Sequence, residues 1–264
     1  MSGKASAKQT AIIRFMEKSK GTQLNCFSPP VMLATLTVEI VLAIYTVWRY
    51  KMSTTTRLIA GLLLGLATFQ LAEYYVCTGI GGPHAEVWSR VGFVAITTLP
   101  AFGTHLVHVL ANKPRRRAVA LSYASMIGFS IFFLAYRGAF VGHECTGNYV
   151  IFQLGNWIGG TYAIGYYYLW LGFGIFMGAH WANELMAKGK KAHTQLQTVR
   201  AFIVGYLVFL VPCAIWNTLD AASRPAIPSI MCGFAVLFAL ILGLYILPRV
   251  GKEKSRLAPM QFKH

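Results

Sequence analysis

Two stretches of the chain bring together side chains that can do chemistry. They are EYYVCTGIGGPHAEVW, residues 73–88, and GHECTGNY, residues 142–149. Both contain carboxylate, imidazole and thiol groups, which can hold a zinc ion, form a disulfide bond or line a ligand pocket. The groups concerned are Glu73, Cys77, His84, Glu86, His143, Glu144 and Cys145. Each of these uses requires the two stretches to lie at the same end of the molecule.

The composition of the chain is that of a membrane protein. Of its 264 residues, 56% are hydrophobic and 12% are charged, whereas about one quarter of the residues in a soluble domain are charged. Lys and Arg outnumber Asp and Glu by 24 to 8, which gives a formal charge of +16. We interpret this excess as contact with anionic lipid at the cytoplasmic face of a bilayer, and not with nucleic acid.

Seven apolar segments of 19 to 25 residues are each long enough to cross a bilayer as a helix, which takes about 20 residues. They are Pro30–Trp48, Leu58–Val76, Trp88–Ala111, Ala118–Tyr136, Trp157–Trp181, Val199–Leu219 and Ala226–Leu247. We therefore predict an all-α fold, a seven-transmembrane-helix bundle over residues 30–248. Before it lies a tail of residues 1–29, which could form an interfacial amphipathic helix. After it lies a basic tail of residues 249–264.

The distribution of basic residues predicts the orientation of the bundle. The connections after the first, third and fifth segments, with the C-terminal tail, contain 16 Lys and Arg residues, and the other three connections contain 3. The positive-inside rule then places the N-terminus outside and the C-terminus in the cytoplasm. Five basic residues in the N-terminal tail oppose this orientation, but they are outweighed by the 16.

Polar side chains within or beside the outer halves of these segments form the main candidate site. An ionisable group at the centre of a membrane costs about 2.5–3.5 kcal/mol on insertion scales, so it is expected to face the interior and to have a partner or a function. The candidate ligand-binding residues are Glu39, Gln70, Glu73, Arg137, Asn156, Asn217, Asp220 and Arg224. The alternative is that they only hold the helices together through hydrogen bonds and ion pairs. We predict that Glu73 is the central functional residue, with Arg137 and Arg224 as its nearest cations.

The cysteines and histidines leave a disulfide and a metal site as alternatives. The predicted outer face carries Cys26, Cys77 and Cys145, and in an oxidising compartment three cysteines suggest one disulfide and one remaining thiol. We predict Cys77–Cys145, with Cys26 as the competing partner of either. A metal would be held by His84 and His143 together with these thiols, or by His105, His108 and His180 toward the cytoplasm. Neither set has the close Cys-x-x-Cys or His-x-x-x-His spacing of a typical zinc site.

The first 110 residues resemble a group of uncharacterised bacterial multi-pass membrane proteins. The resemblance lies in the segment beginning NCFSPPVMLATLTVEIV and in LATFQLAEYYVC. The positions that match are Cys26, Phe27, Ser28, Pro29, Gln70 and Glu73. The segment WSRVGFVAITTLPAFGTHLVHVL resembles one span of the seven-helix sensor modules of bacterial histidine kinases. These resemblances imply a bacterial cytoplasmic membrane and, for the second, a role in signalling through a partner protein.

We expect an integral membrane sensor or ligand-binding protein with a polar site in the outer half of the bundle. The sequence contains no recognisable nucleophile arrangement or phosphate-binding loop, and it names no cofactor, so an enzymatic role is the weaker hypothesis. One alternative is an intramembrane metal-dependent hydrolase. Another is a small proton-coupled transporter in which Glu39 and Glu73 carry protons, although no duplicated half supports it.

Overall fold

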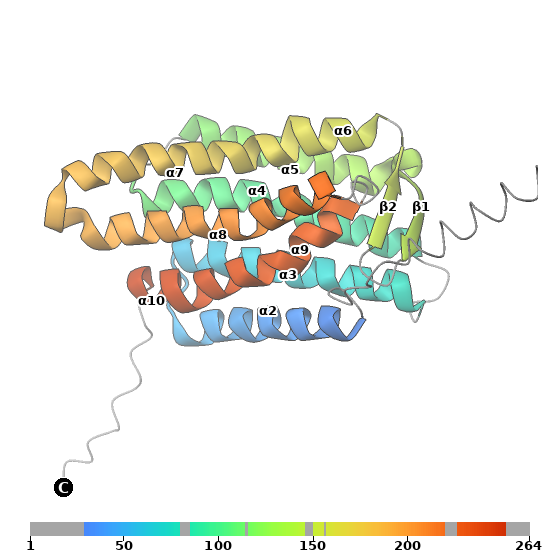
Figure 1. Cartoon of the computed structure of the whole chain (residues 1–264), viewed down its shortest axis with the longest axis horizontal. Coiled ribbons are helices and arrows are strands. Elements are labelled where there is room, and N and C mark those ends of the chain that lie inside the picture. Colours follow the sequence, from blue (N-terminus) through green and yellow to red (C-terminus); the bar gives the residue numbers. More distant parts are fainter. Residues whose placement is uncertain are drawn as a thin grey trace, which may run out of the picture.

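The computed structural model describes residues 29–79, 85–113, 116–145, 150–155, 157–219 and 226–251, and almost all of them are helical (Figure 1). The α-helices are α2 (Pro29–Arg49), α3 (Thr54–Thr78), α4 (Ala85–Leu110), α5 (Arg116–Ala135), α6 (Ile158–Tyr162), α7 (Leu169–Ala187), α8 (His193–Leu219), α9 (Ile227–Leu240) and α10 (Leu247–Val250). Two π-helical segments, η2 (Ala163–Tyr168) and η5 (Ile241–Ile246), join α6 to α7 and α9 to α10. Short 3-10 turns are η1 (Arg137–Ala139) and η3 (Gly189–Ala192).

The predicted all-α membrane bundle is confirmed in this form. Within the described part of the chain, six helices are long and apolar enough to cross a membrane. Each overlaps one predicted segment, although the span that ends at Leu219 begins ten residues earlier than predicted, at Gly189. The chain is therefore an integral multi-pass membrane protein. The predicted segment Trp157–Trp181 is also helical, within the continuous stretch α6–η2–α7, but that stretch is not one of the six.

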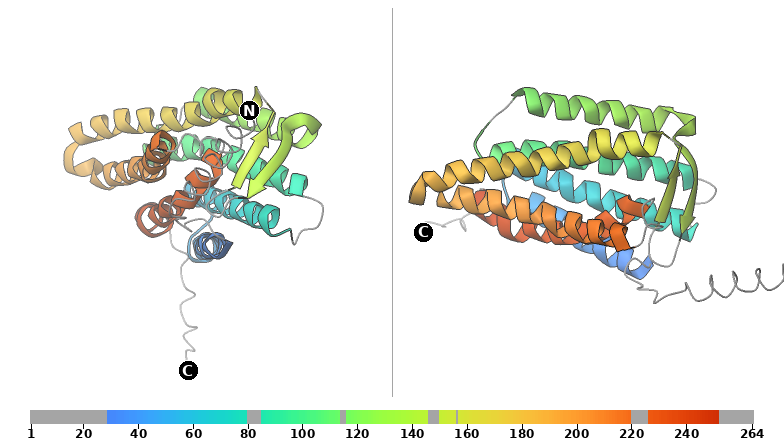
Figure 2. Two further views of the ribbon diagram at one scale, coloured as in Figure 1. Left: turned by 45° about the vertical axis from the view of Figure 1, so that its right-hand side comes forward. Right: turned by 45° about the horizontal axis from the view of Figure 1, so that its top comes forward.

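The helices lie side by side roughly along one axis, as Figure 1 and the right-hand view of Figure 2 show. Helix α3 packs against α2, α4 and α9, and α8 packs against α7, α9 and η5. Helices α3 and α4 are largely buried, whereas α5 is almost wholly at the surface of the bundle. The exposed side chains of α5 include Leu121, Ile127, Ile131 and Leu134, as expected for a helix that faces lipid.

One end of the bundle, called here the hairpin end, is covered by a two-stranded antiparallel sheet. Strand β1 (Phe140–Cys145) pairs with β2 (Val150–Leu154), with an irregularity in register between Phe140 and Gly142. The predicted all-α fold contained no strand in this part of the chain. The hairpin forms because Phe140, Val150 and Phe152 are buried, and the rings of Phe140 and Phe152 lie against Phe93 of α4.

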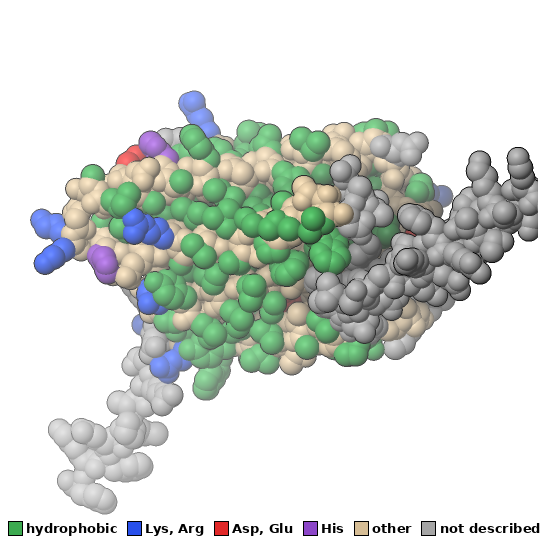
Figure 3. Space-filling view, viewed as in Figure 1, with side chains coloured by type: hydrophobic (Ala, Val, Ile, Leu, Met, Phe, Trp, Pro, Cys, Tyr) green, Lys and Arg blue, Asp and Glu red, His purple; other side chains and the backbone are tan. Residues whose placement is uncertain are grey.

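The opposite end of the bundle is called here the basic end. Lys and Arg side chains gather there in the space-filling view (Figure 3). The described basic residues in the turns at this end are Arg49, Lys51, Arg57, Lys113, Lys188, Lys190 and Lys191. Aliphatic and aromatic side chains cover most of the surface between the two ends in that view, as a lipid-facing belt requires.

Local signals in the sequence set the ends of α3 and so the depth of its polar residues. Ser53 precedes the helix, and its side-chain oxygen accepts a hydrogen bond from the Thr56 amide at 3.2 Å, which is a typical N-cap. Gly79 follows the helix with a φ of 66°, and its amide donates to the Tyr75 carbonyl. This left-handed conformation favours glycine. Glu73 therefore lies less than two turns below the hairpin end.

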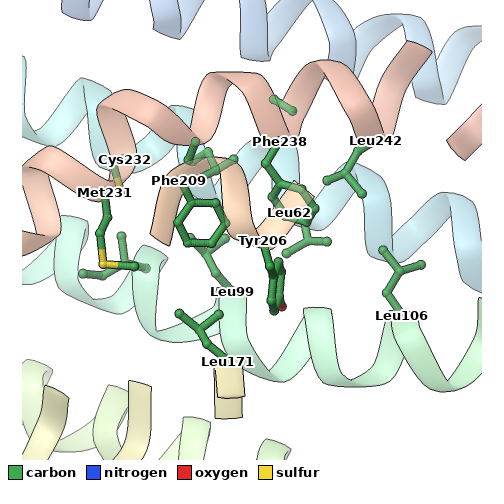
Figure 4. Packing of buried hydrophobic residues seen from close by; sticks show 14 of the residues in the cluster. Leu62, Leu99, Leu106, Leu171, Tyr206, Phe209, Met231, Cys232, Phe238 and Leu242 are labelled. Carbon is green, nitrogen blue, oxygen red and sulfur yellow. The ribbon is translucent and has the colours of Figure 1, made fainter. Parts of the chain in front are cut away.

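Aromatic side chains fill the centre of the bundle between α4, α8 and α9. Tyr206 and Phe209 of α8 lie edge-on to Phe238 and beside it, as Figure 4 shows. The Tyr206 hydroxyl comes so close to α4 that a Cβ atom at Gly103 would lie 1.7 Å from it. Only glycine at position 103 permits this approach of α8 to α4.

Candidate functional site at the hairpin end

A disulfide joins the two stretches that opened the sequence analysis. Cys77 in the last turn of α3 is bonded to Cys145 at the end of β1, with an S–S distance of 1.95 Å and a Cα–Cα distance of 5.6 Å. The predicted pairing is thus the one in the structure, and Cys26 lies outside the described residues. The bond fixes β1 to α3 across 68 residues of sequence. Cys213 and Cys232 are free and buried.

Below the disulfide, two carboxyl groups are buried between α2, α3 and α9. Glu39 of α2 is 0% exposed and Glu73 of α3 is 1% exposed, and the two are near enough to interact electrostatically. Ser229 of α9 is the hydrogen-bonding neighbour of the Glu73 carboxyl. The Cys232 thiol, one turn further along α9, interacts with both glutamates. We call Glu39, Glu73, Ser229 and Cys232 the carboxyl cluster.

The carboxyl cluster contains hydrogen-bonding atoms that have no partner. Both carboxyl oxygens of Glu39 and Oε1 of Glu73 are buried and make no hydrogen bond to the described residues. No Lys, Arg or His in the described ranges forms an ion pair with either group. A buried carboxylate without a cation is very costly. The cluster therefore favours a neutral, protonated carboxyl group or a bound cation.

Ser229 links the carboxyl cluster to the hairpin. Its hydroxyl oxygen accepts a hydrogen bond from the backbone amide of Val150, the first residue of β2, at 3.1 Å. Because that amide uses the oxygen as an acceptor, the single hydroxyl hydrogen of Ser229 remains available for Glu73. Ser229 and Val150 are both fully buried. The chain of contacts Glu73–Ser229–Val150 thus connects α3, α9 and β2 away from solvent.

Beside the cluster, the hairpin, α4, α6, η2 and α9 enclose a pocket of about 620 Å³. This volume is within the usual range of small-molecule sites, roughly 300–1,000 Å³. Phe93 and Phe152 form part of its apolar wall. Gln153 and Tyr167 contribute polar groups, and Gly159 leaves space on the α6 side. We call it the hairpin pocket.

The π-helical segment η2 forms one wall of this pocket through Ala163, Tyr167 and Tyr168. π-Helical turns occur frequently at functional sites. This one is held to α4 by two hydroxyl groups. One belongs to Tyr162, the last residue of α6, whose hydroxyl is 2.9 Å from the Thr97 hydroxyl. The other belongs to Tyr166 of η2, whose hydroxyl donates to the Thr97 carbonyl. The segment is therefore fixed in place and presents its other side chains to the pocket.

The hairpin pocket also adjoins the centre of the bundle. Tyr167 and Met231 line it and also line a small cavity of about 20 Å³ in the aromatic core. Cys232 of the carboxyl cluster lines the same small cavity, and Figure 4 shows it next to Met231 on α9. Met231, which lines the pocket, and Cys232, which belongs to the carboxyl cluster, are thus neighbours on α9.

The other predicted ligand-binding residues do not all join this site. Gln70 is buried one turn from Glu73 on α3. Asn217 donates to the Cys213 sulfur at 3.4 Å. Arg137 is exposed in η1, beyond the end of α5, and forms no ion pair with the buried Glu73, so our choice of it as the partner cation was wrong. The predicted residues Asn156, Asp220, Arg224 and His84 lie outside the described residues.

The arginine that organises the hairpin end was not singled out from the sequence. The Arg90 guanidinium donates to the carbonyl groups of Phe133 and Tyr136, the latter at 3.0 Å, and so satisfies the C-terminal end of α5. It also pairs with Glu86 at 2.6 Å, one turn earlier on α4. The i, i+4 spacing of Glu86 and Arg90 was the available signal.

The histidines toward the basic end have separate partners. His105 Nδ1 lies 3.1 Å from the Tyr123 hydroxyl of α5, whereas His108 packs edge-on against Trp181 of α7. His180 Nε2 lies 3.0 Å from a carboxyl oxygen of Glu184. His143 of β1 is exposed. No group of three potential metal ligands is found in the part of the chain that the structure describes. The predicted set His105, His108 and His180 therefore does not form a three-ligand site, and the other predicted set includes His84, which lies outside the described residues.

Glu184 belongs to a solvent-exposed ion cluster at the basic end. Its second carboxyl oxygen accepts a hydrogen bond from Lys113 Nζ at 2.7 Å. This hydrogen bond, with the positive charge of Lys113, lowers the pKa of the Glu184 carboxyl below its usual value. We call Lys113, His180 and Glu184 the basic-end cluster.

Comparison with known proteins adds no assignment. No family model matches the chain, and no curated protein matches it. Inference about function therefore depends on the hairpin pocket and the carboxyl cluster.

Proposed function

We propose that this protein is a membrane sensor that binds an amphiphilic ligand in the hairpin pocket. The observation that carries the proposal is the size of the pocket, about 620 Å³, together with its lining. Most of that lining is aromatic and aliphatic, with Gln153 and the tyrosines of η2 as the polar exceptions. A site of this kind favours a ligand with a hydrocarbon chain and one small polar group. A ligand dissolved in the bilayer meets both conditions.

We further propose seven crossings, with the hairpin end outside. The stretch Ile158–Ala187 is long enough for the seventh crossing, since 30 residues of helix extend about 45 Å. Its Gly, Tyr and Trp content lowers its hydropathy. The Lys and Arg residues of the basic end support a cytoplasmic location for that end, in contact with anionic lipid. The disulfide at the other end agrees with an oxidising compartment, as outside a bacterial cytoplasmic membrane.

Cysteine labelling tests this orientation. Val141 and Lys190 are exposed at the hairpin end and the basic end respectively. In intact cells, and in a background with Cys26 replaced by Ser, a membrane-impermeant maleimide should label V141C and should label K190C only after lysis. The opposite pattern would invert the proposed orientation.

Signalling would require a partner protein at the basic end, because the described chain contains only the bundle and the hairpin. A proton-coupled transporter is the second candidate, and the buried, cation-free glutamates of the carboxyl cluster are the observation that favours it. A metal-dependent hydrolase has no corresponding observation among the described residues.

Photo-crosslinking tests the ligand site. The probe is a long-chain alcohol that carries a diazirine, added to purified protein in liposomes, with the labelled peptides identified by mass spectrometry. Labelling should fall on α6, η2 and β2 and should be competed by unlabelled alcohol. Gly159→Phe should abolish it, because Gly159 lines the pocket and a Cβ atom added there would have only Leu154 within 4 Å.

A matched control lies one residue away. Gly160 is exposed, and nothing lies within 4 Å of a Cβ at this position. Gly160→Phe makes the same chemical change on the lipid-facing side of α6 and should leave the labelling unchanged. Equal labelling of the two variants, or labelling without saturation, would contradict the proposed site.

A further inference from the structure

We propose that Glu39 and Glu73 form a proton-binding site inside the bundle, and that its protonation favours ligand binding in the hairpin pocket through Ser229 and Val150. This inference rests on the proposed function and adds its regulation. None of the residues of the carboxyl cluster lines the hairpin pocket, whereas β2 does. The cluster would act on the pocket by setting the position of β2.

The first step is the state of the two carboxyl groups. Three of their four oxygens are buried without a hydrogen-bonding partner among the described residues, and the two groups interact with each other. Two negative charges in this place would repel each other in a medium of low dielectric constant. At least one proton is therefore held by the pair in the arrangement that the structure describes. Such an arrangement binds and releases protons without a cationic partner.

The second step is the connection to the pocket. Glu73 contacts Ser229, and Ser229 accepts the amide hydrogen of Val150 at 3.1 Å. Val150 begins β2, and two residues later the same strand contributes Phe152 to the pocket wall. When both carboxyl groups are ionised, they require water, and Glu73 is close to the hairpin end from which water can enter. Entry of water at Glu73 competes with the hydrogen bonds of Ser229 and loosens β2.

Other groups that can ionise lie near the carboxyl pair. Apart from Glu39 on α2 and Glu73 on α3, the Cys232 thiol of α9 interacts with the pair. Behind it, Cys213 of α8 and Tyr167 of η2 interact with Cys232. Thiols and phenols ordinarily ionise at higher pH than carboxyl groups. Cys213 and Cys232 are themselves buried, and burial disfavours the charged form of a thiol as it does that of a carboxyl group. These thiols therefore stay neutral while the carboxyl pair loses its proton.

Charged groups on the remaining neighbouring elements are directed elsewhere. On α4, Glu86 and Arg90 pair with each other. On β1, His143 and Glu144 are exposed. On η5, Tyr245 lies under the Arg249 guanidinium, toward the basic end. Of these, His143 is the only histidine, so it has its own control variant.

The direction of the effect follows from linkage. The arrangement with β2 held by Ser229 binds more protons than the loosened one, so low pH favours it. If the ligand binds this arrangement, binding takes up protons, and the affinity falls as the pH rises through the titration of the pair. The fall is at most about tenfold per pH unit for each proton that is taken up.

The experiment measures saturation of the diazirine alcohol labelling across a pH series in liposomes. The alcohol has no ionisable group, so any pH dependence belongs to the protein. Wild-type protein should show an affinity that falls with rising pH. Glu73→Gln, which keeps the neutral shape, should bind with constant affinity, and Ser229→Ala should also lose the pH dependence because the connection to β2 is cut. Glu144→Gln and His143→Gln should behave as wild type.

A second readout does not depend on the ligand. Hydrogen–deuterium exchange of the β2 amides, corrected for the intrinsic effect of pH, should show protection that declines with rising pH in wild type. In Glu73→Gln the protection should stay constant. If Glu73→Gln does not fold, Glu39→Gln takes its place in both measurements.

The outcomes separate the two proposals. Saturable labelling that is independent of pH, or a pH dependence that persists in Glu73→Gln or vanishes in His143→Gln, would overturn the proton linkage and leave the pocket standing. No saturable labelling at any pH would overturn the ligand proposal, and the exchange measurement would then decide the proton linkage alone. Protection of β2 that does not change with pH in wild type would contradict the proton linkage.

Discussion

Carboxyl groups at the two ends of the bundle differ in exposure and in the partners of their oxygens. Glu184 at the basic end is about one third exposed, and each of its oxygens has a basic partner within 3.0 Å. Glu73 at the hairpin end is 1% exposed, has no ion-pair partner among the described residues and lies near a second buried carboxyl group, Glu39. The first arrangement is complete in itself, whereas the second lacks partners for three oxygens.

This difference supports the proposal that places function at the hairpin end. Exposed ion pairs contribute little to stability and are easily replaced. Buried carboxyl groups without partners reduce stability, and proteins retain such features chiefly at functional sites. The hairpin end also has the disulfide, the π-helical wall and the hairpin pocket. We therefore propose that the carboxyl cluster takes part in the proposed proton and ligand binding, and that the basic-end cluster does not.

The largest expected effect is at the hairpin end. Replacing Cys77 and Cys145 together by Ser should destabilise the hairpin against α3 by about 2–4 kcal/mol, the usual contribution of a disulfide. Thermal unfolding in one detergent, with and without reductant, measures this loss. Reductant should lower the midpoint of wild type and leave the variant unchanged. A wild-type midpoint that does not respond to complete reduction would contradict the role of the bond.

A gain in stability is expected from removing a buried carboxyl group. Glu39→Met replaces two oxygens that have no partner by an apolar side chain of similar length, which should raise stability by about 1–3 kcal/mol. The matched change Glu184→Met at the basic end removes two ion pairs and should produce no gain. Thermal unfolding of both variants measures the contrast. A loss of stability in Glu39→Met would show that the carboxyl group has a structural partner after all.

The smallest effect is the pH and salt response of the basic-end cluster. The pKa of Glu184 is lowered by its hydrogen bond from Lys113, so its contribution is present above the ordinary glutamate pKa of about 4.5. The contribution disappears as the pH falls through the lower pKa of the folded protein. In wild type this difference should be slight and should vanish in high salt. Glu184→Gln should unfold at the same temperature as wild type at pH 7, and a clear drop would contradict the comparison.

The helices were predictable from the sequence because each crossing of the membrane requires about 20 consecutive, mostly apolar residues. The segment Pro30–Trp48 corresponds to α2, Pro29–Arg49, and the other apolar segments overlap their helices with larger differences at the ends. The Cys77–Cys145 pair was predictable because the order of the spans places both residues at the same end of the bundle. The hairpin was not, since its short strands are stabilised by packing of Phe140 and Phe152 on Phe93.

The partner of Glu73 was also out of reach of sequence reasoning. Arg137 was chosen because it lies at the same end of the molecule, but a span prediction does not determine which way a helix is turned. Ser229 was not predicted because nothing in the apolar segment AIPSIMCG indicates which group a single serine contacts. The burial of Glu39 beside Glu73 likewise depends on the contacts among α2, α3 and α9.

The central claim is that Glu39 and Glu73 hold at least one proton at neutral pH. Infrared spectroscopy of the protein in liposomes measures this directly, because the C=O stretching band of a protonated carboxyl group is separate from the bands of a carboxylate. We predict such a band at pH 7 that is removed or shifted in Glu39→Gln and in Glu73→Gln and is unchanged in Glu184→Gln. A spectrum without a protonated carboxyl band at pH 7, or one unaffected by the first two variants, would contradict the account.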